Sequence, residues 1–327
     1  MGFWDGRRVL VTGGAGFIGS HVVELLSAAG RGVKVTAADD MSNGRKENLS
    51  AAPDVRLETA DLKDFDACRR VCEGQEIVLH LAARVGGVGF NVAHPGTMFR
   101  ENMLLAGNMI EAARLAGVER FLMVSSACVY PRFCTIPTPE GEGFKDWPED
   151  TNDGYGWAKR MAEFQAMAYK REFGMRFALV RPYNTYGPRD HFDPETSHVI
   201  PALIRRVLSG EDPIRVWGDG TQTRAFLYVE DAARGMLECT ERFAECDPVN
   251  LGADEEITIR DLIAAVMELC GSRARVEFDV SRPAGQPRRN CDTRKAFEKT
   301  GFRAKVHLRE GLARSIEWYK KTYGRRA

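Results

Sequence analysis

The amino-acid sequence predicts a doubly wound α/β fold, in which helices cover both faces of a mainly parallel sheet and a smaller α/β part follows toward the C-terminus. Short apolar runs typical of strands alternate with amphipathic runs typical of helices through the first half of the chain. Repeated βα units build parallel sheets, because each helix returns the chain to the same edge. Ligands of such sheets bind beyond the carboxyl ends of the strands.

The first unit is an apolar run over residues 8–12 that enters a glycine cluster and leaves as a helix. Gly13 permits a sharp turn, Gly16 lets the backbone approach a diphosphate, and Gly19 lets the helix pack close to the strand. The start of the helix offers free N–H groups and a partial positive charge to an anion. This pattern predicts a Rossmann-type dinucleotide site.

The next strand-like run, over residues 33–38, ends at Asp39, about twenty residues beyond Gly19. An acid at this distance binds the ribose hydroxyls of the dinucleotide. Short segments also follow the strand-like runs over residues 55–60 and 76–81, and we expect them to face the same dinucleotide site. The residues predicted to bind the cofactor in this way are Gly13, Gly16, Phe17, Ile18, Gly19, Asp39, Asp61, Leu62, Leu81, Ala82 and Ala83.

The remaining elements follow in order, and the alternation breaks up past Pro182. One predicted helix ends at Cys72, and three others span 98–116, 161–173 and 198–209. The further predicted strands span 120–125 and 175–180, and the long loops span 133–151 and 188–197. We therefore expect residues 1–187, joined by about 225–255, to form the dinucleotide-binding domain. Residues 188–224 and 256–327 are expected to form the substrate-binding domain.

Composition narrows the function further. Lys and Arg balance Asp and Glu at 46 each, which argues against a nucleic-acid-binding or membrane-surface protein. No apolar run approaches the roughly twenty residues of a membrane helix, and no signal peptide is visible. The eight cysteines form no Cys-x-x-Cys pair, which disfavours a metal site and indicates reduced thiols. We expect a cytoplasmic protein without a bound metal.

Tyr155 and Lys159 are spaced by four residues, so that on a helix their side chains lie on one face. A free phenol has a pKa near ~10 and is a poor base at neutral pH. A nearby ammonium and an oxidised nicotinamide favour the phenolate and lower that pKa. Ser126, at the end of the strand-like run 120–125, can donate a hydrogen bond to the substrate oxygen. These three residues are the predicted catalytic core, and the Tyr and Lys also contact the cofactor.

Together these motifs resemble the extended short-chain dehydrogenases/reductases that act on nucleotide sugars, over about residues 7–323. The matching segments are Thr12–Gly19, Asp61-Leu62, Leu81-Ala82-Ala83, Ser125-Ser126, Tyr155 with Lys159, and Arg181-Pro182-Tyr183-Asn184. The resemblance implies NAD as cofactor and a nucleoside-diphosphate sugar as substrate. It also implies a homodimer formed through the helices at 98–116 and 155–173.

Three further segments resemble two groups within this family, the GDP-mannose 3,5-epimerases and the GDP-L-fucose synthases. These are Ser126-Ala127-Cys128, the segment from Arg84 to Asn91, and Ser197–Pro201. Both groups use the matching Cys as an acid/base beside a sugar ketone. Oxidation at C4 acidifies the hydrogens at C3 and C5, and a thiol and an imidazole both titrate close enough to neutrality to move those protons. Cys128 and His198 are therefore predicted to be catalytic, with the helix dipole lowering the pKa of His198.

The two groups imply different reactions. His198 follows the fucose synthases, whereas the mannose epimerases carry a Lys there; the segments 126–128, 86–90 and 217–224 follow the epimerases. A net reductase needs positive charge around the 2′-phosphate of NADP, and this chain offers Asp39 and Asp40 there, although Arg45 and Lys46 follow. Two like unit charges at about 4 Å repel by roughly 4 kcal/mol near a protein surface. NAD and a redox-neutral epimerase are thus favoured.

Three alternatives stay open: an epimerase-reductase acting on a GDP-4-keto-6-deoxy sugar, a UDP-sugar 4-epimerase, and an NAD-binding sensor or scaffold without catalysis. A GDP-sugar is favoured as substrate by the resemblance alone. Arginine suits the diphosphate because its guanidinium forms two parallel hydrogen bonds. The residues that the resemblance assigns to the substrate are Gly87, Val88, Ser126, Asn184, Arg206, Arg224 and Arg289.

Overall fold

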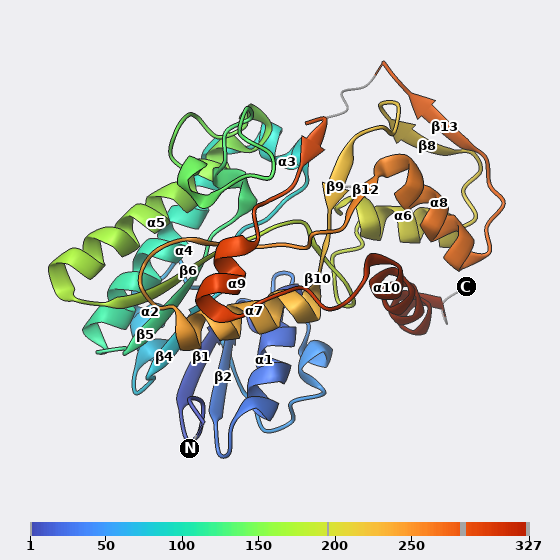
Figure 1. Ribbon diagram of the computed structural model, residues 1–327. Helices are drawn as coiled ribbons and strands as arrows, with labels where there is room; N and C mark the ends of the chain where they lie inside the picture. The colour runs from blue at the N-terminus through green and yellow to red at the C-terminus, as the bar shows by residue number, and fades with distance from the viewer. Residues whose placement is uncertain (1, 195, 282–285, 325–327) are drawn as a thin grey trace.

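The computed structural model describes residues 2–194, 196–281 and 286–324, without the side chain of Val88. Its centre is a seven-stranded sheet in which every neighbouring pair is parallel, as the sequence predicts (Figure 1). From edge to edge the strands are β11 (Val249–Leu251), β6 (Arg176–Pro182), β5 (Arg120–Val124), β4 (Ile77–His80), β1 (Arg8–Thr12), β2 (Lys34–Asp39) and β3 (Arg56–Thr59).

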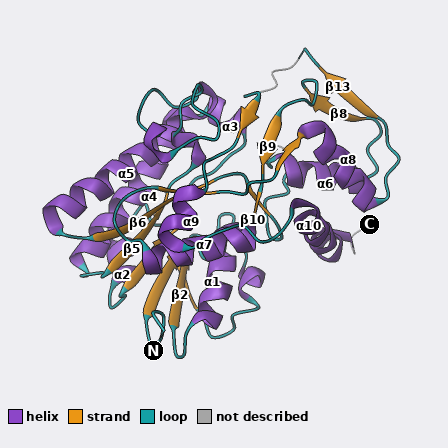
Figure 2. Cartoon of the chain, in the orientation of Figure 1, coloured by secondary structure: helices purple, strands orange, loops and turns teal. Residues whose placement is uncertain are grey.

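Helices cover both faces of this sheet, which confirms the doubly wound class (Figure 2). On one face α1 (Phe17–Ala29) packs against α7 (Val229–Arg242), and their apolar residues share a core with the strands. On the other face lie α2 (Phe65–Cys72), α4 (Pro95–Leu115) and α5 (Asp153–Phe173). Because the sheet is buried on both faces, its strands consist of nearly continuous apolar runs.

The α5 helix begins at Asp153, eight residues before the stretch 161–173 that the apolar pattern marks as helical. Glycine has a low helix propensity, so Gly154 and Gly156 mask the first turn in the sequence. Tertiary packing explains Gly154: a Cβ atom there would lie 2.3 Å from the carbonyl oxygen of Pro95, at the start of α4. The short helix α3 (Val88–Ala93) is also missing from the prediction, because six residues carry too little periodicity.

The smaller part of the molecule lies beyond the carboxyl edge of the sheet and has its own apolar core (Figure 1). Its helices are α6 (Val199–Leu208), α8 (Ile259–Cys270) and α10 (Leu308–Tyr323). Its short strands are β7 (Thr185–Tyr186), β8 (Ile214–Trp217), β9 (Thr223–Ala225), β10 (Leu227–Tyr228), β12 (Glu256–Thr258), β13 (Val276–Asp279) and β14 (Arg288–Arg289). Among the described residues, no helix has the length and apolar character that a bilayer crossing requires.

The division of the chain into two domains stays a prediction, but the places of three elements bear on it. Strand β11 and helix α7, both within the returning segment 225–255, lie on the large sheet. Helix α9 (Arg294–Thr300), from the segment assigned to substrate binding, packs on α7 and β11. The chain thus crosses between the two parts several times, which leaves the carboxyl edge of the large sheet facing the smaller part.

Candidate active site

The glycine turn after β1 has the close packing that its spacing predicts. Gly13 has a φ of +66°, and its N–H donates to the carbonyl oxygen of Ala38 at 2.8 Å. A Cβ atom on Gly19 would lie 2.0 Å from the carbonyl oxygen of Gly13, so any side chain there forces the helix off the turn. Helix α1 begins at Phe17 behind Gly16, and no side chain caps its first turn. These residues fit the diphosphate of a dinucleotide.

We expect Gly19→Ala to lower both the melting temperature and the affinity for the dinucleotide. The added methyl group must displace the Gly13 backbone, and such overpacking typically costs about 1–3 kcal/mol. Gly96→Ala, in α4, is the matched control because a Cβ atom there meets nothing within 4 Å. Calorimetric titration with NAD and thermal unfolding measure both effects. Equal behaviour of the two variants would contradict the assigned packing.

Asp39 ends β2 next to this turn, and the residue is only 7% exposed. Its carboxylate accepts hydrogen bonds from the N–H groups of Ala15 (3.0 Å) and Met41 (2.9 Å). Burial raises the pKa of Asp39, whereas these backbone bonds lower it. Asp40 is exposed and accepts from Ser42. Two carboxylates at the end of β2 suit a ribose diol and oppose a phosphate there.

The other predicted cofactor residues lie at the carboxyl ends of β3 and β4. Asp61 is exposed, while Leu62 is buried. Half-buried Leu81, Ala82 and Ala83 follow β4, and a Cβ on Gly13 would lie 3.0 Å from the Ala82 nitrogen. The Ala82 N–H donates to Thr12 Oγ1 at 3.1 Å. The turn after β1 and the end of β4 therefore meet at one edge of the sheet.

Tyr155 and Lys159 both lie in α5, in the i, i+4 relation that the sequence predicts. Lys159 Nζ donates to the carbonyl oxygen of Val124, the last residue of β5, at 2.9 Å, and lies 5.5 Å from the centre of the Tyr155 ring. Burial raises the pKa of Tyr155, the charge of Cys128 raises it further, and a hydrogen bond with Ser126 lowers it. The net direction is upward, contrary to the predicted lowering, because desolvation of the phenolate is the largest effect. Tyr155, Lys159, Ser126 and Cys128 thus share one small region beside the sheet edge.

Cys128 lies in a single 3₁₀ turn (Ala127–Val129) that Ser126 caps, because Ser126 Oγ accepts from the Cys128 N–H at 3.1 Å. The thiol is partly exposed. Burial lowers the pKa of Arg289, but the charges of Cys128, Tyr183 and Glu149 and a hydrogen bond with Cys128 raise it above its usual value. The Arg289 guanidinium therefore lies against the thiol, a contact that sequence spacing does not reveal.

Arg224 and Arg289 are register partners in the parallel pair of β9 and β14. Burial and then the neighbouring charge of Arg289 lower the pKa of Arg224, the Glu149 carboxylate raises it, and the net pKa is about 10. Two half-buried guanidiniums side by side repel each other unless an anion lies between them. The pair is therefore a candidate diphosphate site. Glu149 was not among the predicted residues, and nothing in its sequence context marks it.

His198 is the N-cap residue of α6, one position before the first helical turn in which it was expected. The His198 residue is exposed to solvent, but protein atoms still lie around its side chain and desolvate it. Desolvation, followed by the charge of His191, lowers its pKa. The direction agrees with the prediction, but the main cause is desolvation rather than the helix dipole. Gly87 reaches this region, because a Cβ on it would lie 3.2 Å from the carbonyl oxygen of Thr196.

The other predicted substrate residues differ in whether their polar groups already have hydrogen-bond partners within the protein. Asn184 has a φ of +33°, and its Nδ2 donates to the carbonyl oxygen of Ala225 at 2.8 Å, which leaves its oxygen for a ligand. Arg206 donates from Nε to Glu211 at 2.8 Å and also from Nη2, a bidentate ion pair. This pairing occupies the guanidinium and weakens its predicted role. The side chain of Val88 lies outside the described part of the structure.

Asp190, in the loop before His198, is a buried carboxyl that sequence analysis did not identify. Burial raises its pKa to about 8, and a hydrogen bond from the His191 N–H lowers it. Its Oδ2 has no partner among the described residues. Because Asp190 in the folded protein retains a proton that it releases near pH 4 in the unfolded chain, the free energy of unfolding falls as pH rises from about 4 to about 8.

We expect Asp190→Asn to flatten this dependence of the free energy of unfolding on pH, measured by denaturant titrations at several pH values. An unchanged dependence would contradict the assignment.

Comparisons with known proteins identify the family to which the chain belongs. The model of the NAD dependent epimerase/dehydratase family matches residues 9–252. The chain is 32% identical to a GDP-L-fucose synthase of Sinorhizobium fredii, covering 96% of this chain and 95% of that one. It is 31% identical to a GDP-mannose 3,5-epimerase of Arabidopsis thaliana, covering 98% of this chain and 84% of that one.

Among solved structures, a UDP-glucose 4-epimerase of Thermotoga maritima with UDP-glucose is similar, with a TM-score of 0.86 and 31% identity over 97% of this chain and 99% of that one. The family that the motifs of the sequence predict is thus confirmed. The chain belongs to the NAD dependent epimerase/dehydratase family, within the extended short-chain dehydrogenases/reductases.

Proposed function

We propose that the protein is an NAD-dependent nucleotide-sugar epimerase of the GDP-mannose 3,5-epimerase type. In this reaction C4 of the sugar is oxidised, protons at C3 or C5 are exchanged, and C4 is reduced again. The observation that carries the proposal is the position of Cys128, a partly exposed thiol that lies beside Tyr155, Lys159 and Arg289 at once. A thiol used only to fill space would be buried away from such groups.

Tyr155 and Lys159 perform the proton transfer at C4. When bound, NAD supplies the acceptor of the C4 hydride and later returns it. The Tyr155 phenolate, stabilised by the Lys159 ammonium, would take the C4 hydroxyl proton as the hydride leaves and so become the phenol. Ser126 donates to the same sugar oxygen. Burial of the dyad strengthens these interactions, because little water competes with them.

Cys128 and His198 act on the carbons beside the ketone. Inversion of a carbon centre needs a base on one face of the sugar and an acid on the other. Cys128 approaches from the end of β5 and His198 from the start of α6, so the two groups come from different parts of the molecule. Arg224 and Arg289 hold the diphosphate, and Asn184 contacts the neighbouring groups.

The cofactor and location that we propose also rest on particular residues. NAD is favoured over NADP because Asp39 and Asp40 lie at the end of β2, while the guanidinium of Arg45 lies over the Tyr323 ring at 5.9 Å. A cytoplasmic location rests on the eight cysteines, which are all free thiols.

His198 favours the second candidate, an epimerase-reductase that consumes NADPH with a GDP-4-keto-6-deoxy sugar.

The distinguishing experiment incubates the purified protein with GDP-mannose and catalytic NAD, and resolves the products by chromatography and NMR. We expect isomers of GDP-mannose and no stoichiometric NADH. Parallel reactions contain UDP-glucose, or a GDP-4-keto-6-deoxy sugar with NADPH. Conversion only in the last reaction, with one NADPH lost per product, would replace the proposal by the epimerase-reductase. Conversion of UDP-glucose alone would indicate a 4-epimerase.

We also propose a homodimer formed by α4 and α5. These helices pack on each other, and they expose Phe99 (39%) and Phe164 (53%) to solvent. Two-fold dimers are the commonest assemblies of such chains, and covered apolar side chains would stabilise one. We expect Phe164→Glu to convert dimer to monomer in light scattering. Val280→Glu, at an exposed residue elsewhere, is the control. A monomeric wild-type protein would exclude this interface.

A further inference from the structure

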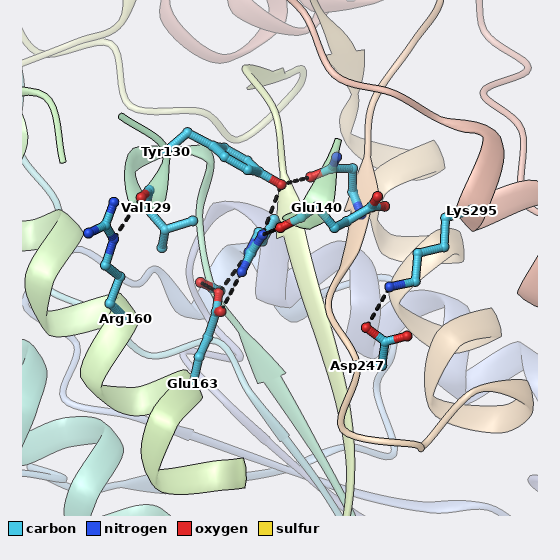
Figure 3. A network of polar contacts seen from close by, with 10 residues as sticks. Val129, Tyr130, Glu140, Arg160, Glu163, Asp247 and Lys295 are labelled. Carbon is cyan, nitrogen blue, oxygen red and sulfur yellow. Dashed lines mark hydrogen bonds and ion pairs between the residues drawn. The ribbon is translucent and has the colours of Figure 1, made fainter. Parts of the chain in front are cut away.

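Glu163 and Arg181 form a buried ion pair, and Figure 3 shows Glu163 within the network of polar contacts to which this pair belongs. The side chains of Glu163, on α5, and Arg181, on β6, are 0% and 1% exposed. Arg181 donates from Nε to Glu163 Oε1 at 2.9 Å and from Nη2 to Oε2 at 2.6 Å. Two parallel bonds from a planar guanidinium fix a carboxylate in position and orientation. The mechanism described above makes no use of this pair.

Glu163 faces the catalytic lysine. Tyr155, Lys159 and Glu163 follow one another at intervals of four along α5, so they form a row on one face of the helix. Lys159 Nζ donates to the carbonyl oxygen of Val124, and the hydroxyl of the next residue, Ser125, donates to Glu163 Oε1. The amino group and the carboxylate are thus held against consecutive residues at the end of β5.

The groups around Lys159 differ in charge. Burial lowers the pKa of Lys159, the charges of Glu163 and Cys128 raise it, and the net pKa is about 8. His80, on β4, is neutral, because burial and then the charge of Lys159 lower its pKa to about 3. Tyr155 is an uncharged neighbour of Lys159, because burial raises the pKa of its phenol. Glu163 accepts three hydrogen bonds, as an ionised carboxylate does, and so is the fixed anion in this group.

We propose that Glu163 is a positioning residue of the active site: its buried carboxylate keeps the amino group of Lys159 protonated, so that this group can polarise Tyr155. Arg181 and Ser125 hold the carboxylate in place. The inference rests on the catalytic role proposed for Tyr155 and Lys159. It assigns to Glu163 a function beyond packing, because a neutral side chain of the same shape would not support the charge on the lysine.

The same network also has structural consequences, which the test must separate. Arg181 Nη1 donates to Tyr130 Oη at 3.0 Å, and Tyr130 Oη donates to Asn250 Oδ1 at 2.5 Å. Tyr130 follows Cys128 by two residues, and Asn250 Nδ2 donates to the carbonyl oxygens of Thr138 (3.0 Å) and Asp292 (3.4 Å). Breaking the pair therefore disturbs the Cys128 turn as well. A variant that keeps the charge is needed as a control.

The test measures the ionisation of Lys159 directly, in the protein without substrate or cofactor. Protein labelled with ¹³C at lysine Cε is titrated by NMR, and Lys159→Met identifies the signal. In the wild type we expect a midpoint near the pKa of about 8 given above. In Glu163→Gln we expect it to fall by about 1–3 pH units, the effect of losing an opposite charge at close range. Glu163→Asp keeps the charge and should stay close to the wild type.

An unshifted midpoint in Glu163→Gln would overturn the proposal. If that variant does not fold, Glu163→Gln combined with Arg181→Met removes both charges and leaves no unpaired ion in the core, which proteins often tolerate. Its midpoint should also fall, and a midpoint equal to the wild type would again overturn the proposal. A fall of the same size in Glu163→Asp would show a structural effect and count against the charge.

Kinetics separate this inference from the proposed function. Catalysis needs protonated Lys159, so kcat should decline as pH rises through its pKa, and this decline should begin at lower pH in Glu163→Gln. A merely structural role lowers kcat by the same factor at every pH. If the wild type converts no nucleotide sugar, the proposed function fails, while the NMR titration still decides the role of Glu163.

Discussion

Cys128→Ser is expected to lose proton exchange at C3 and C5 while it retains hydride transfer at C4. Serine keeps the shape of the side chain, but its hydroxyl is far less acidic than a thiol and cannot serve as the base near neutral pH. A positioned acid/base group contributes about 10²–10⁴ in rate, so exchange should slow by that factor. The measurement compares deuterium uptake from D₂O with the transient absorbance of NADH at C4 oxidation.

The effect of this substitution on folding should be small, because Cys128 is partly exposed and lies in a short 3₁₀ turn. Cys134→Ser is the matched control, since Cys134 is also a partly exposed thiol, hydrogen-bonded to Thr138 at 3.3 Å. Full exchange in Cys128→Ser would remove the thiol from the mechanism. Equal loss in both variants would point to a general effect of thiol replacement.

Tyr155→Phe is expected to lower both activities strongly, in contrast to Cys128→Ser. The phenol acts at C4, and without C4 oxidation the protons at C3 and C5 are not acidic. We expect kcat to fall about 10²–10⁴-fold, with NAD affinity nearly unchanged because the ring remains. Turnover and calorimetric NAD binding measure the two effects. Retention of every activity would favour an NAD-binding sensor or scaffold over an enzyme.

The features predicted from the sequence depend on short-range geometry. The glycine turn needs Gly13 and Gly19 at fixed spacing within one βα unit, and the structure confirms the close approach. Asp39 lies at the end of the next strand, and Tyr155 and Lys159 share one helix face. Each relation spans a few residues or one supersecondary unit, so the local period of the sequence determines it.

The features that were missed join residues that are far apart in the chain. The Glu163–Arg181 pair connects α5 to β6, and the Arg289 contact with Cys128 brings β14 to the end of β5. The carboxyl of Asp190 is buried by tertiary packing alone. Such contacts depend on how elements pack, which local patterns do not encode. Only Glu163 had a local signal, the spacing of four residues from Lys159.

The most direct test of the account follows deuterium in GDP-mannose. The wild-type protein, loaded with NAD, is incubated with the sugar nucleotide in D₂O, and the recovered nucleotides are analysed by mass spectrometry and NMR. We expect deuterium bound to C3 or C5, with hydrogen retained at C4 because the hydride returns from the cofactor. Isomerised product that carries no deuterium at either carbon would contradict it.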